Sequence, residues 1–128
     1  MLRMYTLLLA GILGLGAAGC GSGGNDGGSF DVNWNLIYAD GTYATCAGTY
    51  TTEVHVDVQN INSGAPYHDK FACSDRGGTT ASLPVGDYTV ALRSYDVYNN
   101  LLSEYDFLDT YPIYAGRVTL LPDVNLEY

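Results

Sequence analysis

Strict alternation of apolar and polar side chains is the feature that most constrains the fold of this chain. From Phe30 to Tyr38 every even-numbered residue is aromatic or aliphatic, while Asp31, Asn33 and Asn35 hold odd positions. The segment 51–59 repeats the pattern with valine at every second position from 54 to 58. Because successive side chains of a strand point to opposite faces, a period of two indicates half-buried β-strands.

Shorter segments of the same kind follow, separated by turn signals. Asp40-Gly41 and Asn99-Asn100 are typical of hairpin turns, and Pro122 interrupts the last apolar segment. No stretch of ten or more residues combines helical periodicity with caps. About seven to nine short strands predict one all-β antiparallel sandwich. Further strands are expected at 43–47, 70–73, 79–83, 88–95, 101–107, 117–121 and 124–128, with loops over 60–69 and 108–116.

The alternation also predicts which side chains lie in the core. We expect burial of Trp34, Val54, Val56, Val58, Leu83, Tyr88, Val90 and Leu92. We expect exposure of Asp31, Asn33, Glu53, Asp57 and Arg93.

A short apolar segment ends at Cys20 and precedes a glycine-rich stretch. Arg3 stands before the apolar run, and Ala17-Ala18-Gly19 separates that run from the cysteine. A membrane span needs about 20 apolar residues, and this run is shorter and lacks a positively charged stop. The arrangement resembles the signal peptide and lipobox of bacterial lipoproteins, although Ala17 stands where the lipobox prefers leucine. An ordinary secretory signal cut after Gly19 is the alternative.

The resemblance implies cleavage before Cys20, a diacylglycerol on its thiol and an acylated amino terminus. The chain then has three parts: a signal peptide at 1–19, a Gly/Ser-rich tether at 20–29 and a β-sandwich domain at 30–128. Gly21 after the cysteine resembles the outer-membrane sorting pattern of Gram-negative bacteria. We therefore expect a lipid-anchored outer-membrane protein that faces the periplasm or the cell surface.

The charge of the chain excludes two classes of partner. Five basic residues stand against 14 acidic ones, and loss of Arg3 with the signal peptide leaves four, for a net charge of −10. Nucleic-acid binders need a basic footprint, and anionic lipid headgroups attract basic segments. We expect no nucleic-acid partner and no membrane contact other than the lipid.

Two cysteines remain once Cys20 carries lipid. Cys46 and Cys73 are 27 positions apart, and an exported domain lies in a compartment that permits disulfides. The alternative is a Cys/His metal site with His55 or His68, but no metal-ligand spacing supports it. We expect a disulfide and no metal.

The segment Leu83-Pro84-Val85-Gly86-Asp87-Tyr88-Thr89-Val90 resembles the LPxGxYxV signature of Ig-like and transthyretin-like modules. These modules include Cna-B-type repeats of surface adhesins and regulatory domains of carboxypeptidases. The resemblance implies that Leu83 enters the core, that Pro84 to Gly86 form a bend and that Tyr88 begins a core strand. Lys70 is the only lysine and follows a polar loop, so we expect no internal isopeptide bond of the Cna-B type.

Candidates for catalysis have plainer interpretations. His55 and Asp57 share a strand face and could act as base and acid, but an outward polar face explains the same pattern. The Tyr67-His68-Asp69 loop lacks a nucleophile motif, and the loop aspartates lack a calcium-binding pattern. We expect no catalytic residue, no cofactor and no enzymatic activity.

One group of aromatic residues is the candidate binding surface. It comprises Tyr95, Tyr98, Tyr105, Tyr111 and Tyr114. Exposed aromatic rings beside acidic residues fit a protein or glycan site, and edge-strand packing fits them as well. We expect a non-catalytic envelope protein whose sandwich binds a partner protein or acts as an accessory or structural subunit. A carbohydrate-binding module at the cell surface is the alternative.

Overall fold

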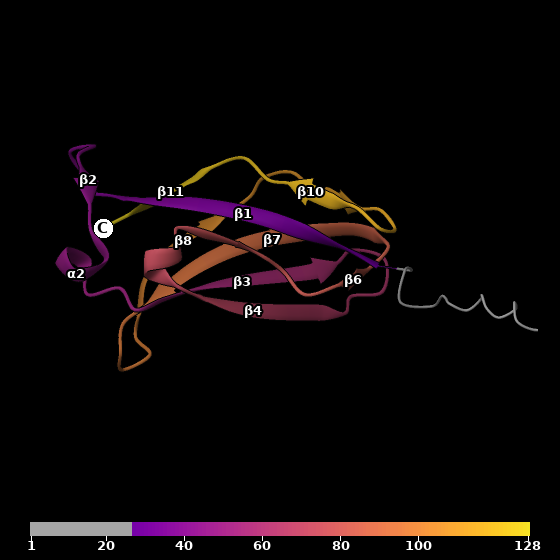
Figure 1. Cartoon of the computed structure of the whole chain (residues 1–128), viewed down its shortest axis with the longest axis horizontal. Helices are drawn as coiled ribbons and strands as arrows, with labels where there is room; N and C mark the ends of the chain where they lie inside the picture. The colour runs from indigo at the N-terminus through magenta and orange to yellow at the C-terminus, as the bar shows by residue number, and fades with distance from the viewer. Residues whose placement is uncertain (1–26) are drawn as a thin grey trace, which may run out of the picture.

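The computed structural model describes residues 27–128, of which 58% lie in β-strands and 7% in helical turns (Figure 1). The predicted all-β class is confirmed, but residues 27–128 contain eleven strands where seven to nine were predicted, and the first sheet includes parallel pairs where an antiparallel sandwich was predicted. Cys20, the signal peptide at 1–19 and the tether up to residue 26 lie outside the described residues. The strands are β1 (Gly27–Ile37), β2 (Tyr43–Ala44), β3 (Glu53–Asn60), β4 (Pro66–Ala72), β5 (Gly77–Thr79), β6 (Leu83–Pro84), β7 (Gly86–Tyr95), β8 (Leu101–Asp106), β9 (Tyr111–Ile113), β10 (Val118–Leu120) and β11 (Val124–Glu127). Two short helical turns are α2 (Cys46–Thr49) and η3 (Cys73–Asp75).

The first sheet is organised around β1, which pairs with short strands on both sides. On one side β10 and β11 run parallel to it, in register with its two halves. On the other side β6, β5 and β2 run antiparallel to it. Parallel pairing occurs here because β1 and the last two strands come from opposite ends of the domain, so no hairpin fixes their direction.

The second sheet has the order β4-β3-β7-β8 and is antiparallel throughout, with β9 continuing the β8 edge beside the start of β7. The register of β3 on β7 runs from Glu53 opposite Tyr95 to Asn60 opposite Tyr88. This register places the three valines of β3 on the inner face.

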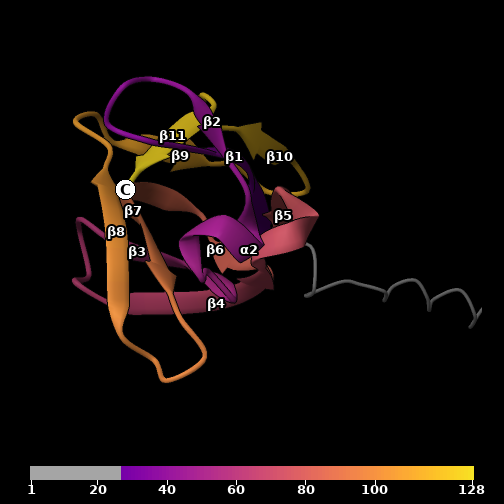
Figure 2. The same ribbon diagram turned by 90° about the vertical axis from the view of Figure 1, so that its left-hand side faces the viewer.

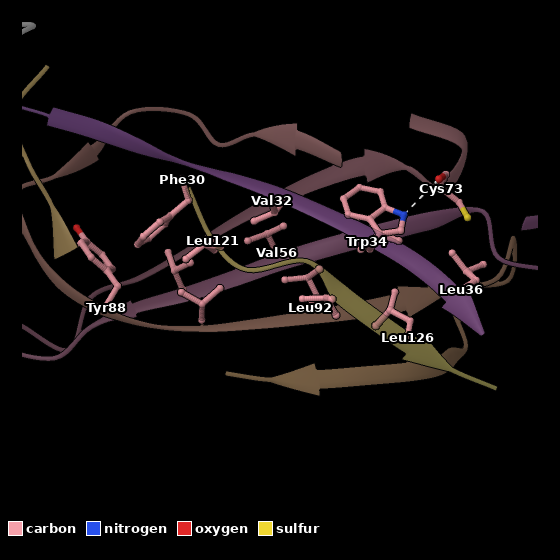
Figure 3. Packing of buried hydrophobic residues seen from close by; sticks show 14 of the residues in the cluster. Phe30, Val32, Trp34, Leu36, Val56, Cys73, Tyr88, Leu92, Leu121 and Leu126 are labelled. Carbon is pink, nitrogen blue, oxygen red and sulfur yellow. Dashed lines mark hydrogen bonds between the residues drawn. The ribbon is translucent and has the colours of Figure 1, made fainter. Parts of the chain in front are cut away.

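The core lies between the two sheets (Figure 3). Every side chain predicted to be buried is at most 5% exposed, and Trp34 is 1% exposed. The rings of Phe30 from the first sheet and Tyr88 from the second meet edge to face, with centroids 5.9 Å apart. Such an aromatic pair stabilises the fold by about 0.5–1.5 kcal/mol beyond the contribution of the apolar area that it buries.

The bend that leads into β7 has the features that its motif implies. Leu83 and Tyr88 are buried, and the Tyr88 hydroxyl donates a hydrogen bond of 2.6 Å to the carbonyl oxygen of Pro84. Gly86 has a φ of 153°, and a Cβ there would lie 2.6 Å from the Asn60 amide nitrogen. Glycine is therefore needed at this position, both for its backbone angle and for the close approach of Asn60.

Several boundaries differ from those predicted. β1 begins at Gly27, inside the segment expected to be tether, because Ser29 N–H donates to Arg117 O at 3.0 Å. β4 begins at Pro66, and β9 lies in the expected loop over 108–116. The segment around Cys46 is helical and not extended. For β1, β9 and α2 the pairing partner or covalent link is distant in sequence, whereas β4 forms a hairpin with β3 in which Pro66 lies opposite Gln59.

The predicted surface residues are less exposed than expected. Of the five, only Asn33 is exposed, while Asp31, Glu53, Asp57 and Arg93 are half-buried. The face assignment is right, but long side chains on neighbouring strands cover one another.

Candidate functional site

Two segments meet at the end of the domain opposite Gly27: the turn after α2 and the hairpin between β7 and β8 (Figures 1 and 2). Tyr50, Val97 and Tyr98 are exposed there by 80%, 73% and 82%. A cluster of large apolar side chains exposed to solvent is typical of an interaction surface. They line a shallow groove, which we call the distal groove, together with Cys46, Ala47, Thr51, Thr52 and Asp96.

One wall of the distal groove is a hairpin tip held by Asp96. Its carboxylate accepts hydrogen bonds from the backbone N–H of Tyr98 at 2.9 Å and of Asn100 at 2.8 Å. Asn99 supplies the positive φ of 66° that the turn requires. The bond from the Asn100 N–H is the main reason that the pKa of Asp96 lies below its ordinary value. The tip therefore has a fixed shape and a charged carboxylate.

The other wall is the turn that ends α2. Thr45 caps the helix by accepting the Gly48 N–H at 2.8 Å, and Tyr50 leaves the helix with a left-handed φ of 61°. Thr52 N–H then donates to Tyr95 O at 2.8 Å, which links this wall to the end of β7. A tyrosine in this backbone region costs about 1–2 kcal/mol relative to ordinary helical geometry.

A disulfide fixes α2 to the rest of the domain. Cys46 and Cys73 are bonded with their Cα atoms 6.0 Å apart, which confirms the predicted pair. The bond joins two helical turns, whereas the sequence suggested two strand ends. Both thiols are thereby removed from metal chemistry, and residues 27–128 contain no cluster of three or more His, Cys, Asp or Glu side chains placed to hold a metal ion.

The five tyrosines of the predicted binding surface are not brought together. Tyr98 lies in the distal groove. Tyr95 stacks on His55, with ring centroids 4.2 Å apart, on the outer face of the second sheet.

The remaining three tyrosines lie elsewhere. Tyr105 and Tyr111 contact Phe107 edge to face at 5.1 Å and 5.5 Å. Tyr114, which is 54% exposed, lies after β9 with the Arg117 guanidinium 6.0 Å from its ring. Tyr98 is therefore the member of the predicted set that takes part in the groove.

Sequence reasoning did not single out Tyr50, the second large ring of the groove. It lies 48 positions before Tyr98, and the disulfide and the Thr52–Tyr95 hydrogen bond bring the two segments together. An aromatic residue in a polar turn four positions after a cysteine was the available signal.

A polar network covers the outer face of the second sheet. Asp57 on β3 contacts His68 Nδ1 on β4, and its other oxygen accepts a hydrogen bond of 2.8 Å from Arg93 on β7. Burial acts to raise the pKa of Asp57, but the hydrogen bonds from His68 and Arg93 outweigh it and the pKa lies below its ordinary value. Arg93 also approaches Glu104 and Asp106 at 3.6 Å and 3.7 Å.

His55 lies on the outer face of the second sheet, as the sequence predicted, but it is buried there and only 5% exposed. Tyr95 and His68 cover its ring, and its Nε2 lies 3.0 Å from a Glu53 carboxylate oxygen. Within residues 27–128 no hydroxyl or thiol bonds to either histidine ring. The network therefore links three neighbouring strands through polar contacts, and it contains no hydroxyl or thiol bonded to a histidine that could serve as a nucleophile.

No family model and no curated protein matches the chain. Among solved structures, it is similar to a leucine-rich repeat protein from Bacteroides thetaiotaomicron, with 15% sequence identity and a TM-score of 0.50. The similarity covers 80% of this chain and 14% of that protein. Within residues 27–128, no helix is long and apolar enough to cross a membrane. At this identity the likeness concerns the fold alone.

Proposed function

We propose that this chain is a non-catalytic lipoprotein of the cell envelope whose Ig-like β-sandwich binds a partner protein through the distal groove. The observation that carries the proposal is the exposure of Tyr50, Val97 and Tyr98 in one groove, formed by the turn after α2 and the β7–β8 hairpin. Tyrosine suits such a role because its ring is large and rigid and its hydroxyl remains hydrated.

The lipid anchor and the groove fit one arrangement. Cys20 is seven positions before Gly27, a length of chain that reaches at most about 25 Å. A lipid at Cys20 would therefore keep the Gly27 end close to the outer membrane. The distal groove would then point away from the bilayer, toward proteins of the periplasm or of the cell surface.

The Ig-like character rests on two supports. The two sheets pack face to face around one core, and the LPxGxYxV segment forms the bend that the signature implies. Such modules bind, space or stiffen other components in many settings, so the groove and not the fold carries the functional argument.

Site-specific photo-crosslinking in cells tests the proposal. A photoreactive residue at position 98 or 50 is expected to trap an envelope protein. The same residue at position 114 is the control, because Tyr114 is exposed but lies outside the groove. Equal trapping at 98 and 114 would contradict a binding role for the distal groove.

A carbohydrate is the second candidate ligand for the groove. The observation that favours it is the pair of exposed tyrosine rings in a shallow groove beside Asp96, because sugar faces pack on aromatic rings. A glycan array probed with the full chain separates the two. Binding that is lost in Tyr98→Ser but kept in Tyr114→Ser would favour the carbohydrate, whereas no glycan binding together with a crosslinked protein would favour the protein partner.

A further inference from the structure

A second groove lies along the side of the domain, between one edge of each sheet. β8 is the last strand of the second sheet along residues 101–106, and β11 is the last strand of the first. The two strands border a groove, which we call the edge groove. Its lining residues are Leu101, Leu102, Ser103, Glu104, Tyr105, Asp123, Asn125 and Glu127.

The backbone of β8 is open toward this groove. Phe107 N–H donates to Val90 O at 3.0 Å, which fixes the phase of hydrogen bonding between β7 and β8. In an antiparallel pair only alternate residues bond to the partner strand, so Glu104 and Asp106 direct their N–H and C=O groups away from β7. Within residues 27–128 neither residue has another backbone partner.

The backbone of β11 is open in the same direction. Tyr128 N–H donates to Ile37 O at 3.0 Å, so Tyr128 is one of the residues of this segment that bond to β1. Every second residue of a strand bonds to the same neighbour, so Asn125 and Glu127 direct their backbone groups away from β1. An extended segment in the edge groove would therefore meet unpaired donors and acceptors on β8, beside a second open edge.

The opposite edge of the second sheet is protected by contrast. β4 carries Pro66 and Lys70, the only lysine in the chain, and residues of both types discourage strand addition. β8 reads Leu-Leu-Ser-Glu-Tyr-Asp and has neither proline nor lysine. Of these two edges of the second sheet, the one at β8 is the more open to a new strand.

The charges of the edge groove determine which strand can enter. Glu104, Asp123 and Glu127 line it, and no basic residue does. Arg93 lies 3.6 Å from Glu104 and offsets part of one charge. A second copy of this chain would bring the same acids, and the whole chain has a net charge of −9, so self-pairing at this edge is opposed.

We propose that the edge groove binds an extended, basic peptide segment of a partner protein, which adds to β8 as a further strand. Its backbone would bond to the open groups of Glu104 and Asp106. Its lysine or arginine side chains would face the carboxylates of the groove, and its apolar side chains would lie against Tyr105. This site is separate from the distal groove and does not require the lipid anchor.

Fluorescence anisotropy with a defined probe tests the proposal. The protein is the full chain in a non-ionic detergent, and the probe is a labelled, capped octapeptide of alternating lysine and valine. We expect saturable binding that weakens as salt is added, because ionic attraction is screened. An octapeptide of alternating glutamate and valine should not bind. Equal binding of both peptides, or no binding of the lysine peptide, would overturn the proposal.

Proline variants test the strand geometry. Glu104→Pro removes an outward N–H and should weaken binding about tenfold beyond the charge-only variant Glu104→Gln. Ala72→Pro is the matched control on the β4 edge, where the φ of −66° suits proline, and it should bind like the parent chain. Equal loss in Glu104→Pro and Ala72→Pro would contradict addition at β8.

A charge-reversed variant tests the same proposal independently, and it serves if Glu104→Pro does not fold. Combined Glu104→Lys, Asp123→Lys and Glu127→Lys should abolish binding of the lysine peptide and create binding of the glutamate peptide. Tyr98→Ser should leave both results unchanged, so the outcome is separable from that of the distal groove. Retained binding of the lysine peptide by the reversed chain would overturn the proposal.

Discussion

The indole nitrogen of Trp34 donates a hydrogen bond of 3.3 Å to the carbonyl oxygen of Cys73 (Figure 3). The bond joins the middle of β1 to the residue that closes the disulfide, and both residues are 1% exposed. The single tryptophan and the buried half of the disulfide, Cys73, thus form one unit, while Cys46 is half-buried. Through Cys46, this unit also determines where α2 and the distal groove lie.

Replacement of Trp34 by phenylalanine should destabilise the domain. The Cys73 carbonyl would lose its buried donor, at a cost of about 1–3 kcal/mol, and the smaller ring would leave a cavity. Each 1 kcal/mol lowers the melting temperature of a domain of this size by about 4–8 °C. Thermal unfolding followed by circular dichroism is the measurement. Tyr43→Phe is the control, because Tyr43 is 77% exposed, and an equal shift in the two variants would contradict the assignment.

Removal of the disulfide should destabilise the domain by about 3.5 kcal/mol in the chain-entropy model, given its separation of 27 residues. We expect Cys46→Ala/Cys73→Ala to melt well below the parent chain while strand content is kept at low temperature. Mass spectrometry of protein from the envelope should show the pair two hydrogens lighter than the dithiol. Two freely alkylated thiols in native protein would be the contrary result.

The parts of the fold that the sequence predicts are those fixed by local burial. The strands predicted from the alternation in Phe30–Tyr38 and in β3 are present because a half-buried strand must place every second side chain in the core. The bend at Gly86 was recognisable because its motif is contiguous. The cysteine pair was recognisable because two thiols remain once Cys20 is assigned to lipid.

The parts that the sequence missed depend on contacts between distant residues. β9 and the early start of β1 arise from pairing across the domain, and the adjacent residues carry weak strand signals of their own. The half-burial of Asp57 reflects His68 and Arg93 on neighbouring strands. The distal groove needed the position of Tyr50 relative to Tyr98, which only the folded chain supplies.

The Asp57 network should give the domain part of its acid sensitivity. The pKa of Asp57 is lower in the folded state than its ordinary value of 3.8, so the folded state binds protons less readily. The stabilisation is complete above about pH 4 and is lost as pH falls through the lowered folded value. Asp57→Asn should flatten the decline in stability below pH 4, as measured by urea unfolding.

His68→Gln supplies an independent check on that prediction. It removes one of the two donors that lower the pKa of Asp57, so it should also reduce the acid-dependent part of the stability. Glu53 and Asp96 also have lowered pKa values, so some acid dependence should remain in both variants. A decline below pH 4 as steep in Asp57→Asn as in the parent chain would exclude the network as a source.

The proposed anchor predicts that Cys20 carries the lipid. Cells fed a clickable palmitate analogue should label the parent chain and leave Cys20→Ser unlabelled. The variant should also leave the membrane fraction. Several acyl chains anchor a protein stably, and a chain with 14 acidic against five basic residues gives little electrostatic attraction to anionic lipid once the acyl chains are lost. Cys46→Ala/Cys73→Ala is the control and should keep its label. Equal labelling of Cys20→Ser would contradict the anchor.

Substitutions of Tyr50 should change the stability of the domain and its binding at the distal groove independently. Its left-handed φ of 61° disfavours any residue with a Cβ, whereas glycine adopts it freely at the cost of a more flexible unfolded chain. These effects nearly cancel, so Tyr50→Gly should keep the melting temperature or raise it slightly. Tyr50→Val, with a branched side chain in the same backbone region, should lower it by several degrees.

The same glycine variant should lose partner capture at the distal groove because it lacks the exposed ring. The photoreactive residue at position 98 reports this loss, and thermal unfolding of the same sample shows that the fold is intact. Tyr43→Gly, which removes an exposed ring outside the groove lining, should capture as the parent chain does. Full capture by a stable Tyr50→Gly chain would restrict the binding surface to the β7–β8 hairpin, whereas loss of capture with unchanged stability would assign Tyr50 to the surface that meets the partner.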